Sequence, residues 1–153
     1  SWVFPTYIAL EDRGAYFQPI FSSVKTFGAA TFYLSNAKDK DGNWLDGGKN
    51  YKFTVPADAP VKNFWSVIAY DLETGAFIPE MERDGIASST KGIQTNQDGS
   101  VDIYFGPEAP KGQESNYVPT AKGKRYFLLF RFYGPEPAVF DKSWKLNDFE
   151  PID

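Results

Sequence analysis

From residue 29 onward, hydrophobic and polar positions alternate along short stretches of the chain. Apolar side chains occupy every second position in residues 51–55 and again in 101–105, which is the period of a β-strand with one buried face. Residues 63–70 and 125–133 are apolar at almost every position, and this predicts strands covered on both faces. The pattern therefore predicts several short strands and almost no helix.

Gly, Pro and Asp positions indicate the turns and connections between these strands. Residues 93–105 predict a β-hairpin, because the turn Gln97-Asp98-Gly99 separates two strand-like stretches. Residues 30–34 and 76–78 predict two further short strands. Residues 80–92 and 106–123 are rich in Gly, Ser or Pro and predict connections without strands, the first of them mobile.

The first 28 residues have a different pattern. Phe17, Ile20, Phe21 and Val24 follow the i, i+3, i+4, i+7 spacing of an amphipathic helix. Pro19 lies inside this stretch and predicts a short or interrupted helix. The apolar stripe needs a cover, which is either the sheet of the same domain or a partner on the N-terminal side. We expect residues 1–28 to be a helical or extended segment that links to an absent upstream domain.

Short strands, long connections and regular turns together predict a mainly β fold. We expect an antiparallel jelly-roll β-sandwich over residues 29–153 with a short N-terminal helical segment, because long connections favour Greek-key or jelly-roll winding over a meander. At 153 residues the chain is the length of one domain.

Composition excludes several chemistries. The chain has no His and no Cys, so imidazole bases, thiol nucleophiles and disulfides are absent. With 20 acidic against 16 basic residues the net charge is −4, and we expect no nucleic-acid partner. No run of about 18 apolar residues occurs, so no membrane span is expected. We expect no metal and no cofactor. Asp39-x-Asp41-x-Asn43 resembles the start of a calcium loop, but Trp44 and Asn50 occupy its Gly and Glu positions, and a hairpin turn is the favoured interpretation.

Arg131 is the most informative charged residue, because it lies between Phe130 and Phe132 in a stretch that otherwise reads as interior. A buried guanidinium needs a carboxylate or carbonyl partner, and Asp71 and Asp102 are the candidates. Two interpretations remain open. Arg131 forms a buried or edge ion pair, or it forms a clamp for an anion or a sugar hydroxyl.

Aromatic residues make up 18% of the chain, and most of them are needed for a core. Trp44 and Tyr117 are the better candidates for stacking on a sugar or another ring, because they lie in predicted loops. Tyr133 follows Arg131 in the same strand and joins the candidate ligand-binding residues.

A series of short motifs recurs in one order along the chain. The motifs are Leu45-Asp46-Gly47-Gly48-Lys49-Asn50-Tyr51, Asn63-Phe64-Trp65-Ser66-Val67, Tyr70-Asp71 with Thr74, Asn96-x-Asp98-Gly99-Ser100-Val101-Asp102, Tyr104-Phe105-Gly106-Pro107, Ala109-Pro110-Lys111-Gly112, Arg131-x-Tyr133-Gly134-Pro135 and Trp144. Over roughly residues 29–150 this series resembles the bacterial domain-of-unknown-function family numbered twelve-fourteen.

The resemblance implies a jelly-roll β-sandwich that forms the C-terminal half of a two-domain protein, whose N-terminal half is the family numbered twelve-fifty-four. It implies no agreed activity, cofactor or catalytic residue. Many members are exported, which implies a periplasmic or secreted location. The chain departs from the family pattern at Thr74-Gly75-Ala76, where a charged group is missing, and at Asn116-Tyr117, where Trp usually follows Asn.

Three functional hypotheses follow from the sequence. The first is a non-catalytic module that packs on a partner domain or subunit and binds a neutral small ligand or glycan. The second is a hydrolase or lyase that uses Asp71, Asp102 and Arg131 with Tyr side chains in a cleft shared with the missing domain. The third is an assembly domain, which a large exposed apolar patch would favour.

Overall fold

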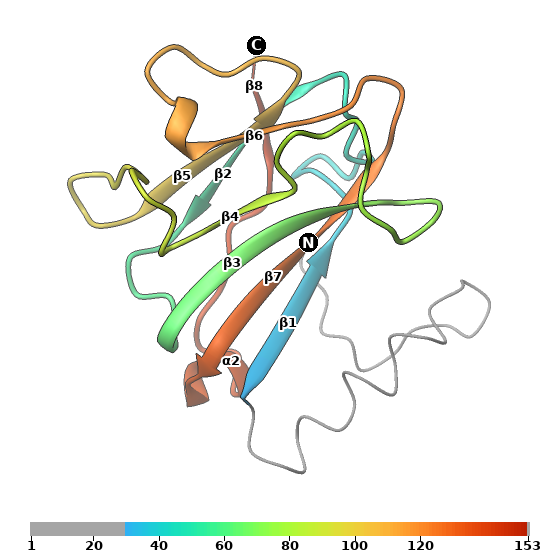
Figure 1. The fold of residues 1–153 in the computed structure, drawn as a ribbon. Helices are drawn as coiled ribbons and strands as arrows, with labels where there is room; N and C mark the ends of the chain where they lie inside the picture. Colours follow the sequence, from blue (N-terminus) through green and yellow to red (C-terminus); the bar gives the residue numbers. More distant parts are fainter. Residues whose placement is uncertain (1–29, 153) are drawn as a thin grey trace.

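The computed structural model describes residues 30–152, which fold into two four-stranded sheets packed face to face (Figure 1). The predicted helix around Phe17 to Val24 lies outside the described residues. The described chain contains eight strands, one turn of 3-10 helix and one short α-helix, joined by turns and loops. Their bounds are β1 Thr31–Asn36, β2 Asn50–Val55, β3 Val61–Asp71, β4 Gly85–Ala87, β5 Val101–Gly106, η3 Glu114–Asn116, β6 Tyr117–Pro119, β7 Tyr126–Pro135, α2 Pro137–Phe140 and β8 Glu150–Ile152.

The first sheet has the order β1-β7-β3-β4, and all its neighbouring strands are antiparallel. Its two longest strands, β3 and β7, lie at its centre, as expected for stretches that are apolar on both faces. The second sheet has the order β6-β5-β2-β8. There β5 and β6 are parallel, which corrects the prediction of a purely antiparallel sandwich.

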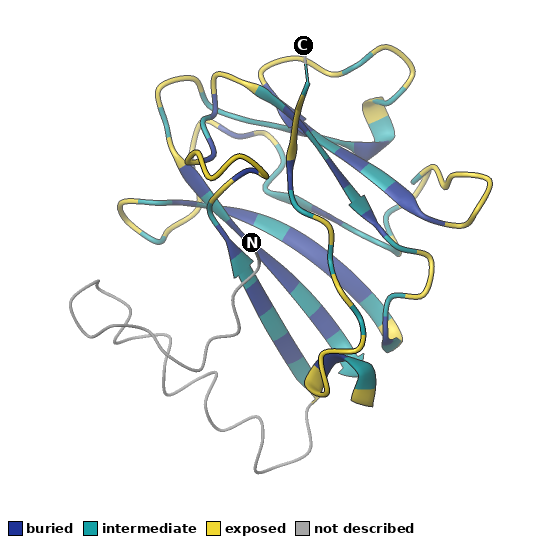
Figure 2. Ribbon diagram, turned by 180° about the vertical axis from the view of Figure 1, so that it is seen from behind, coloured by how far each residue is buried: buried dark blue, intermediate teal, exposed yellow. Residues whose placement is uncertain are grey.

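The core lies between the sheets. Along β1 and β2 every second residue is buried, and Figure 2 shows the alternation of buried and half-buried positions along the strands. Rings from both sheets meet inside: Phe53 of β2 lies 6.2 Å from Phe130 of β7, measured between ring centroids. Phe149, which precedes β8, stacks on Phe53 at 4.7 Å. The prediction of a mainly β fold whose two layers pack through aromatic side chains is confirmed.

Four local predictions are wrong. Residues 93–96 form no strand, although the backbone N–H of Asn96 donates to the carbonyl of Ser100 at the predicted turn. Residues 76–78 form no strand either. Conversely, β4 and β6 lie inside the stretches 80–92 and 106–123, which were expected to be connections.

No helix of the described residues is long and apolar enough to cross a membrane.

Candidate functional site

The outer face of the first sheet carries an unusual number of aromatic side chains. Strand pairing places Tyr33, Arg131, Ser66 and Ala87 in one row across the sheet, with Thr31, Tyr133 and Phe64 in the next row. These outward positions are half-buried, except Ser66, which is buried. We call this surface the aromatic face. Its aromatic members are Tyr33, Phe64, Tyr70, Phe77, Phe127 and Tyr133.

The rings of the aromatic face form two stacks. Phe64 and Tyr133 stack at 4.1 Å between ring centroids. Tyr70 stacks on Phe127 at 5.5 Å and on Phe77 at 5.0 Å. The Phe77 side chain is 53% exposed, so the second stack ends in a ring that is open to a partner.

Arg131 lies between Tyr33 and Tyr133. Its guanidinium carbon is 5.1 Å from the ring centre of Tyr33 and 5.9 Å from that of Tyr133, which are cation–π distances. Its Nε is buried and has no hydrogen-bond partner. None of the ion pairs found among residues 30–152 includes Arg131.

Electrostatics of the site come from its tyrosines. Burial alone lowers the pKa of Arg131, but a hydrogen bond to Tyr33 and the nearby hydroxyls of Tyr133 and Tyr70 outweigh it and raise that pKa. Burial also raises the pKa of Tyr70, which the charge of Arg131 partly offsets. Arg131 is therefore a permanent cation in a largely apolar surface.

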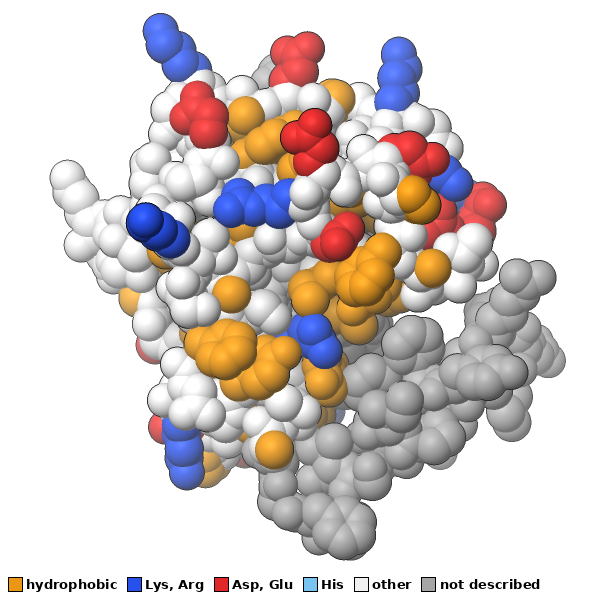
Figure 3. Space-filling model, viewed as in Figure 1, with side chains coloured by type: hydrophobic (Ala, Val, Ile, Leu, Met, Phe, Trp, Pro, Cys, Tyr) orange, Lys and Arg blue, Asp and Glu red, His pale blue; other side chains and the backbone are white. Residues whose placement is uncertain are grey.

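Figure 3 displays this side of the molecule, with groups of hydrophobic side chains and a basic side chain beside them over β3 and β7. Such a surface is neither a core nor an ordinary solvated face. A cation embedded among rings is typical of surfaces that contact other molecules.

The structure does not bring Asp71 to Arg131. Asp71 ends β3 and points to the inner side, in the same alternation as Trp65 and Ala69. On that strand the residue opposite Arg131 is Ser66, so the two charged residues are separated along the sheet by five positions, or about 17 Å. The carboxylate of Asp71 accepts hydrogen bonds from the backbone N–H groups of Glu73 and Thr74.

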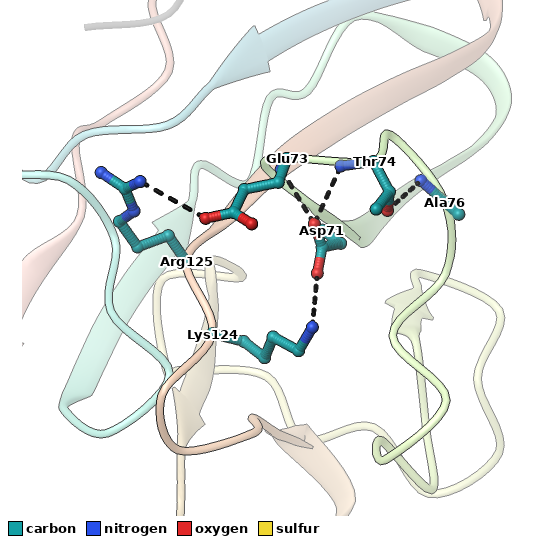
Figure 4. Close-up of polar contacts among 6 residues, drawn as sticks. All are labelled: Asp71, Glu73, Thr74, Ala76, Lys124 and Arg125. Atoms are coloured by element: carbon teal, nitrogen blue, oxygen red, sulfur yellow. Dashed lines mark hydrogen bonds and ion pairs between the residues drawn. The ribbon is translucent and has the colours of Figure 1, made fainter.

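Asp71 also pairs with Lys124, whose Nζ lies 3.3 Å from its Oδ2 (Figure 4). The bond from the Thr74 N–H is the largest cause of a lowered pKa; burial opposes it, and the Glu73 N–H and Lys124 add to it. Asp71 therefore stabilises the turn that follows β3.

Asp102 is also apart from Arg131. It points outward from β5 in the second sheet, where its carboxylate accepts a hydrogen bond from the hydroxyl of Thr54 on β2. Since Arg131 points outward from the first sheet, the two residues lie on opposite outer faces of the sandwich. The predicted pairing of Arg131 with Asp71 or Asp102 is wrong for this reason.

Trp44 and Tyr117 are placed separately from the aromatic face. The Trp44 side chain is 47% exposed, and the ammonium of Lys38 lies 4.9 Å from its ring centre. The hydroxyl of Tyr117 donates to the carbonyl of Gly106, so this ring closes the end of the parallel pair β5 and β6. Of the six residues selected from the sequence, only Arg131 and Tyr133 come together.

A shallow hollow of about 340 Å³ lies beside the start of β3. Trp144 forms one wall, and its indole N–H donates to Asp58 at 3.0 Å. The same ring contacts Phe130 and Phe132 of the core. Trp144 therefore closes the end of the sandwich, and its one polar group is already satisfied.

The acidic loop at Asp39 is a turn. One oxygen of Asp39 accepts hydrogen bonds from the backbone N–H groups of Asp41 and Asn43, and the other accepts from the Asn43 side chain. Within residues 30–152 no group of three or more acidic side chains is arranged to hold a metal ion.

Sequence reasoning missed Tyr33, Phe64, Phe77 and Phe127 as members of the site. A signal was present: β3 and β7 carry aromatic residues at positions of both parities, so one set must point away from the core. The sequence alone did not tell which strands are neighbours, and the rows across the sheet depend on that.

Comparison with solved structures supports the fold assignment. The VPA0106 protein from Vibrio parahaemolyticus is 21% identical with a TM-score of 0.72, and the match covers 86% of this chain and 34% of that one. An uncharacterised protein from Burkholderia cenocepacia is 17% identical with a TM-score of 0.50, over 81% of this chain and 30% of that one. The chain thus spans about a third of the length of these proteins. No curated protein matches it. A family model described as "Protein of unknown function (DUF1214)" matches residues 30–137.

Proposed function

We propose that this chain, which belongs to the DUF1214 family of proteins of unknown function, is a non-catalytic β-sandwich module that packs through its aromatic face on a partner domain or subunit. The observation that carries the proposal is the aromatic face itself. Five rings and one cation point outward from a sheet whose other face already forms the core, and Phe77 from the connection after β3 adds a sixth ring by stacking on Tyr70. Large apolar patches on the surface of a domain mark interaction sites.

The size of similar proteins supports a partner within the same polypeptide. The two solved structures with this fold are about three times as long as their match to the chain. Interfaces between domains and subunits are enriched in Tyr, Phe and Arg, which is the composition of the aromatic face. We further propose that residues 29–153 form this module with jelly-roll winding; the adjacency of β1 to β7 and of β2 to β5 supports it.

The geometry gives less support to a hydrolase or lyase that combines Asp71, Asp102 and Arg131. The carboxylate of Asp71 is hydrogen-bonded within the turn that follows β3, and Asp102 lies on the outer face of the second sheet. A neutral ligand or glycan on Trp44 remains a second proposal. It rests on the 47% exposure of that ring, and Lys38 already contacts the ring.

The test compares one substitution in two contexts. Phe77→Ser removes the open ring of the aromatic face, and Trp44→Ser removes a ring of similar exposure elsewhere. Melting temperatures are measured for both variants in the 153-residue chain and in the natural protein, which under this proposal also contains the partner domain or binds the partner subunit. We expect Phe77→Ser to lower the melting temperature more in the natural protein than in the chain alone, and Trp44→Ser to have the same effect in both. An equal effect of Phe77→Ser in both contexts would contradict the proposal.

A further inference from the structure

The aromatic face carries polar groups in Thr31, Ser66 and its tyrosine hydroxyls, but Arg131 is its one charged member, and this cation defines what a partner must supply. We propose that Arg131 is the anchor for one carboxylate, carried by an Asp or Glu of the partner surface that covers the aromatic face. This inference rests on the proposed function, because it states the chemistry of the partner surface.

The first argument is charge balance. A partner that covers the aromatic face removes water from Arg131, and a desolvated guanidinium is stable only when an acceptor replaces that water. Within residues 30–152 Arg131 has a hydrogen bond with the neutral hydroxyl of Tyr33 but no carboxylate partner: its buried Nε makes no hydrogen bond, and none of the ion pairs in this part of the chain includes it. The carboxylates of Asp71 and Asp102 are bonded elsewhere.

The second argument is geometry. The rings of Tyr33 and Tyr133 flank the guanidinium at 5.1 and 5.9 Å, so its orientation is largely set before any partner arrives. A planar guanidinium held in place presents two parallel N–H donors, which match the two oxygens of a carboxylate. In the same row of the sheet, β3 and β4 carry only the small side chains of Ser66 and Ala87, so no large side chain of that row blocks an approach from that side.

The third argument concerns the class of partner. A polyanion such as a nucleic acid is bound by many cations spread along its path. The outward strand positions of the first sheet present one central cation among rings, in a chain of net charge −4. One carboxylate within an apolar protein surface fits this arrangement, and a row of phosphates does not.

The first experiment tests the site chemistry directly with benzoate as the probe. Benzoate carries a ring and a carboxylate, and benzamide is its neutral match. The ¹H–¹⁵N signal of the Arg131 Nε–H is followed by NMR and assigned by its loss in Arg131→Lys. We expect benzoate to shift this signal in a saturable way, and benzamide to bind about tenfold more weakly because it lacks the charge. Equal shifts with both probes, or no shift with benzoate, would overturn the proposal.

The second experiment uses the natural protein with its partner surface in place. Arg131→Met keeps the packing and removes the charge, whereas Arg131→Glu reverses it. We expect the melting temperature to fall in the order wild type, Arg131→Met, Arg131→Glu, with a smaller difference between the two variants in the 153-residue chain. If either variant leaves the melting temperature of the natural protein unchanged or raises it, the proposed carboxylate anchor is contradicted.

The two proposals fail in different ways. Suppose that Phe77→Ser lowers the melting temperature of the natural protein selectively, whereas Arg131→Met and Arg131→Glu do not. The proposal that the aromatic face packs on a partner is then supported, and the carboxylate anchor at Arg131 is wrong. If Phe77→Ser has no selective effect, the proposed function fails as well.

Discussion

The guanidinium carbon of Arg131 lies 5.1 Å from the ring centre of Tyr33, and the two residues face each other directly across β7 and β1. The strand register thus places a cation over a ring on the side of the sheet that faces away from the core. The register of β3 on β7 places Phe64 beside Tyr133. The aromatic face therefore results from pairing of strands that are far apart in the sequence.

A double-mutant cycle should detect this contact. We expect Arg131→Met and Tyr33→Leu to show a favourable coupling of about 0.5–1 kcal/mol in the free energy of unfolding, because cation–π pairs at partly exposed sites contribute about that much. Urea unfolding of the four proteins measures it. Arg131→Met with Tyr104→Leu is the control, because Tyr104 points outward from the second sheet. Equal coupling in both cycles would show that the contact contributes nothing.

Asp71 should make stability depend on pH. Its pKa is lowered in the folded protein, mainly by the bond from the Thr74 N–H. It therefore contributes stability that is present above the unfolded pKa and lost as pH falls through the folded pKa. We expect Asp71→Asn to be less stable than wild type by about 1 kcal/mol at pH 7, with the difference shrinking in acid.

Lys124→Met is the companion variant for Asp71. Because the backbone bond is a larger cause of the shift than Lys124, most of the pH dependence should remain when the lysine is removed. Thermal unfolding between pH 2 and 7 measures both variants, taking about 3.9 as the ordinary pKa of the carboxyl. If Lys124→Met abolishes the pH dependence, the turn is not its main origin.

Gly47 should not tolerate a side chain. A Cβ at this position would collide with the backbone carbonyl of Ala121, whereas at Gly48 the nearest atom belongs to the side chain of Asp46 at 3.3 Å. We expect Gly47→Ala to cost about 1–3 kcal/mol, the usual range for overpacking against backbone, and Gly48→Ala to cost less. Chemical denaturation compares the two, and equal costs would contradict the close approach.

Asn116 should stabilise the attachment of the connection between β4 and β5 to strand β5. Its side chain is 1% exposed, accepts from the Gln94 N–H, and donates to the carbonyls of Gln94 and Asp102. We expect Asn116→Ala to cost about 1–3 kcal/mol, because it leaves buried backbone groups unpaired. Gln97→Ala, an exposed change in the neighbouring turn, should have almost no effect in the same denaturation experiment.

The sequence was most informative for strands whose own pattern of hydrophobic residues determines where they form. The period of two in residues 51–55 and the apolar stretch 125–133 both predicted strands that the structure contains. The failure at 93–96 has a specific cause: the side chain of Asn116 occupies the backbone groups of Gln94, a contact over 22 residues that no local pattern reveals.

The candidate site depended even more on long-range pairing. Arg131 was selected because a charge in an apolar strand is unusual, and that reasoning holds. Its partners were predicted wrongly because the sequence does not tell which face of which sheet a charged residue occupies. Tyr33 is 98 positions away from Arg131 in the chain, and only the register of β1 on β7 brings them together.

Solvent exposure of the aromatic face in the natural protein tests the central claim most directly. Hydroxyl-radical footprinting can measure the oxidation rates of Tyr70, Phe77 and Tyr133 in the 153-residue chain and in the natural protein, with Trp44 as the internal reference. We predict that the three rings of the aromatic face are oxidised several-fold more slowly in the natural protein, while the rate at Trp44 is unchanged. Equal rates for Phe77 in both samples would mean that nothing covers the face, and would contradict the account.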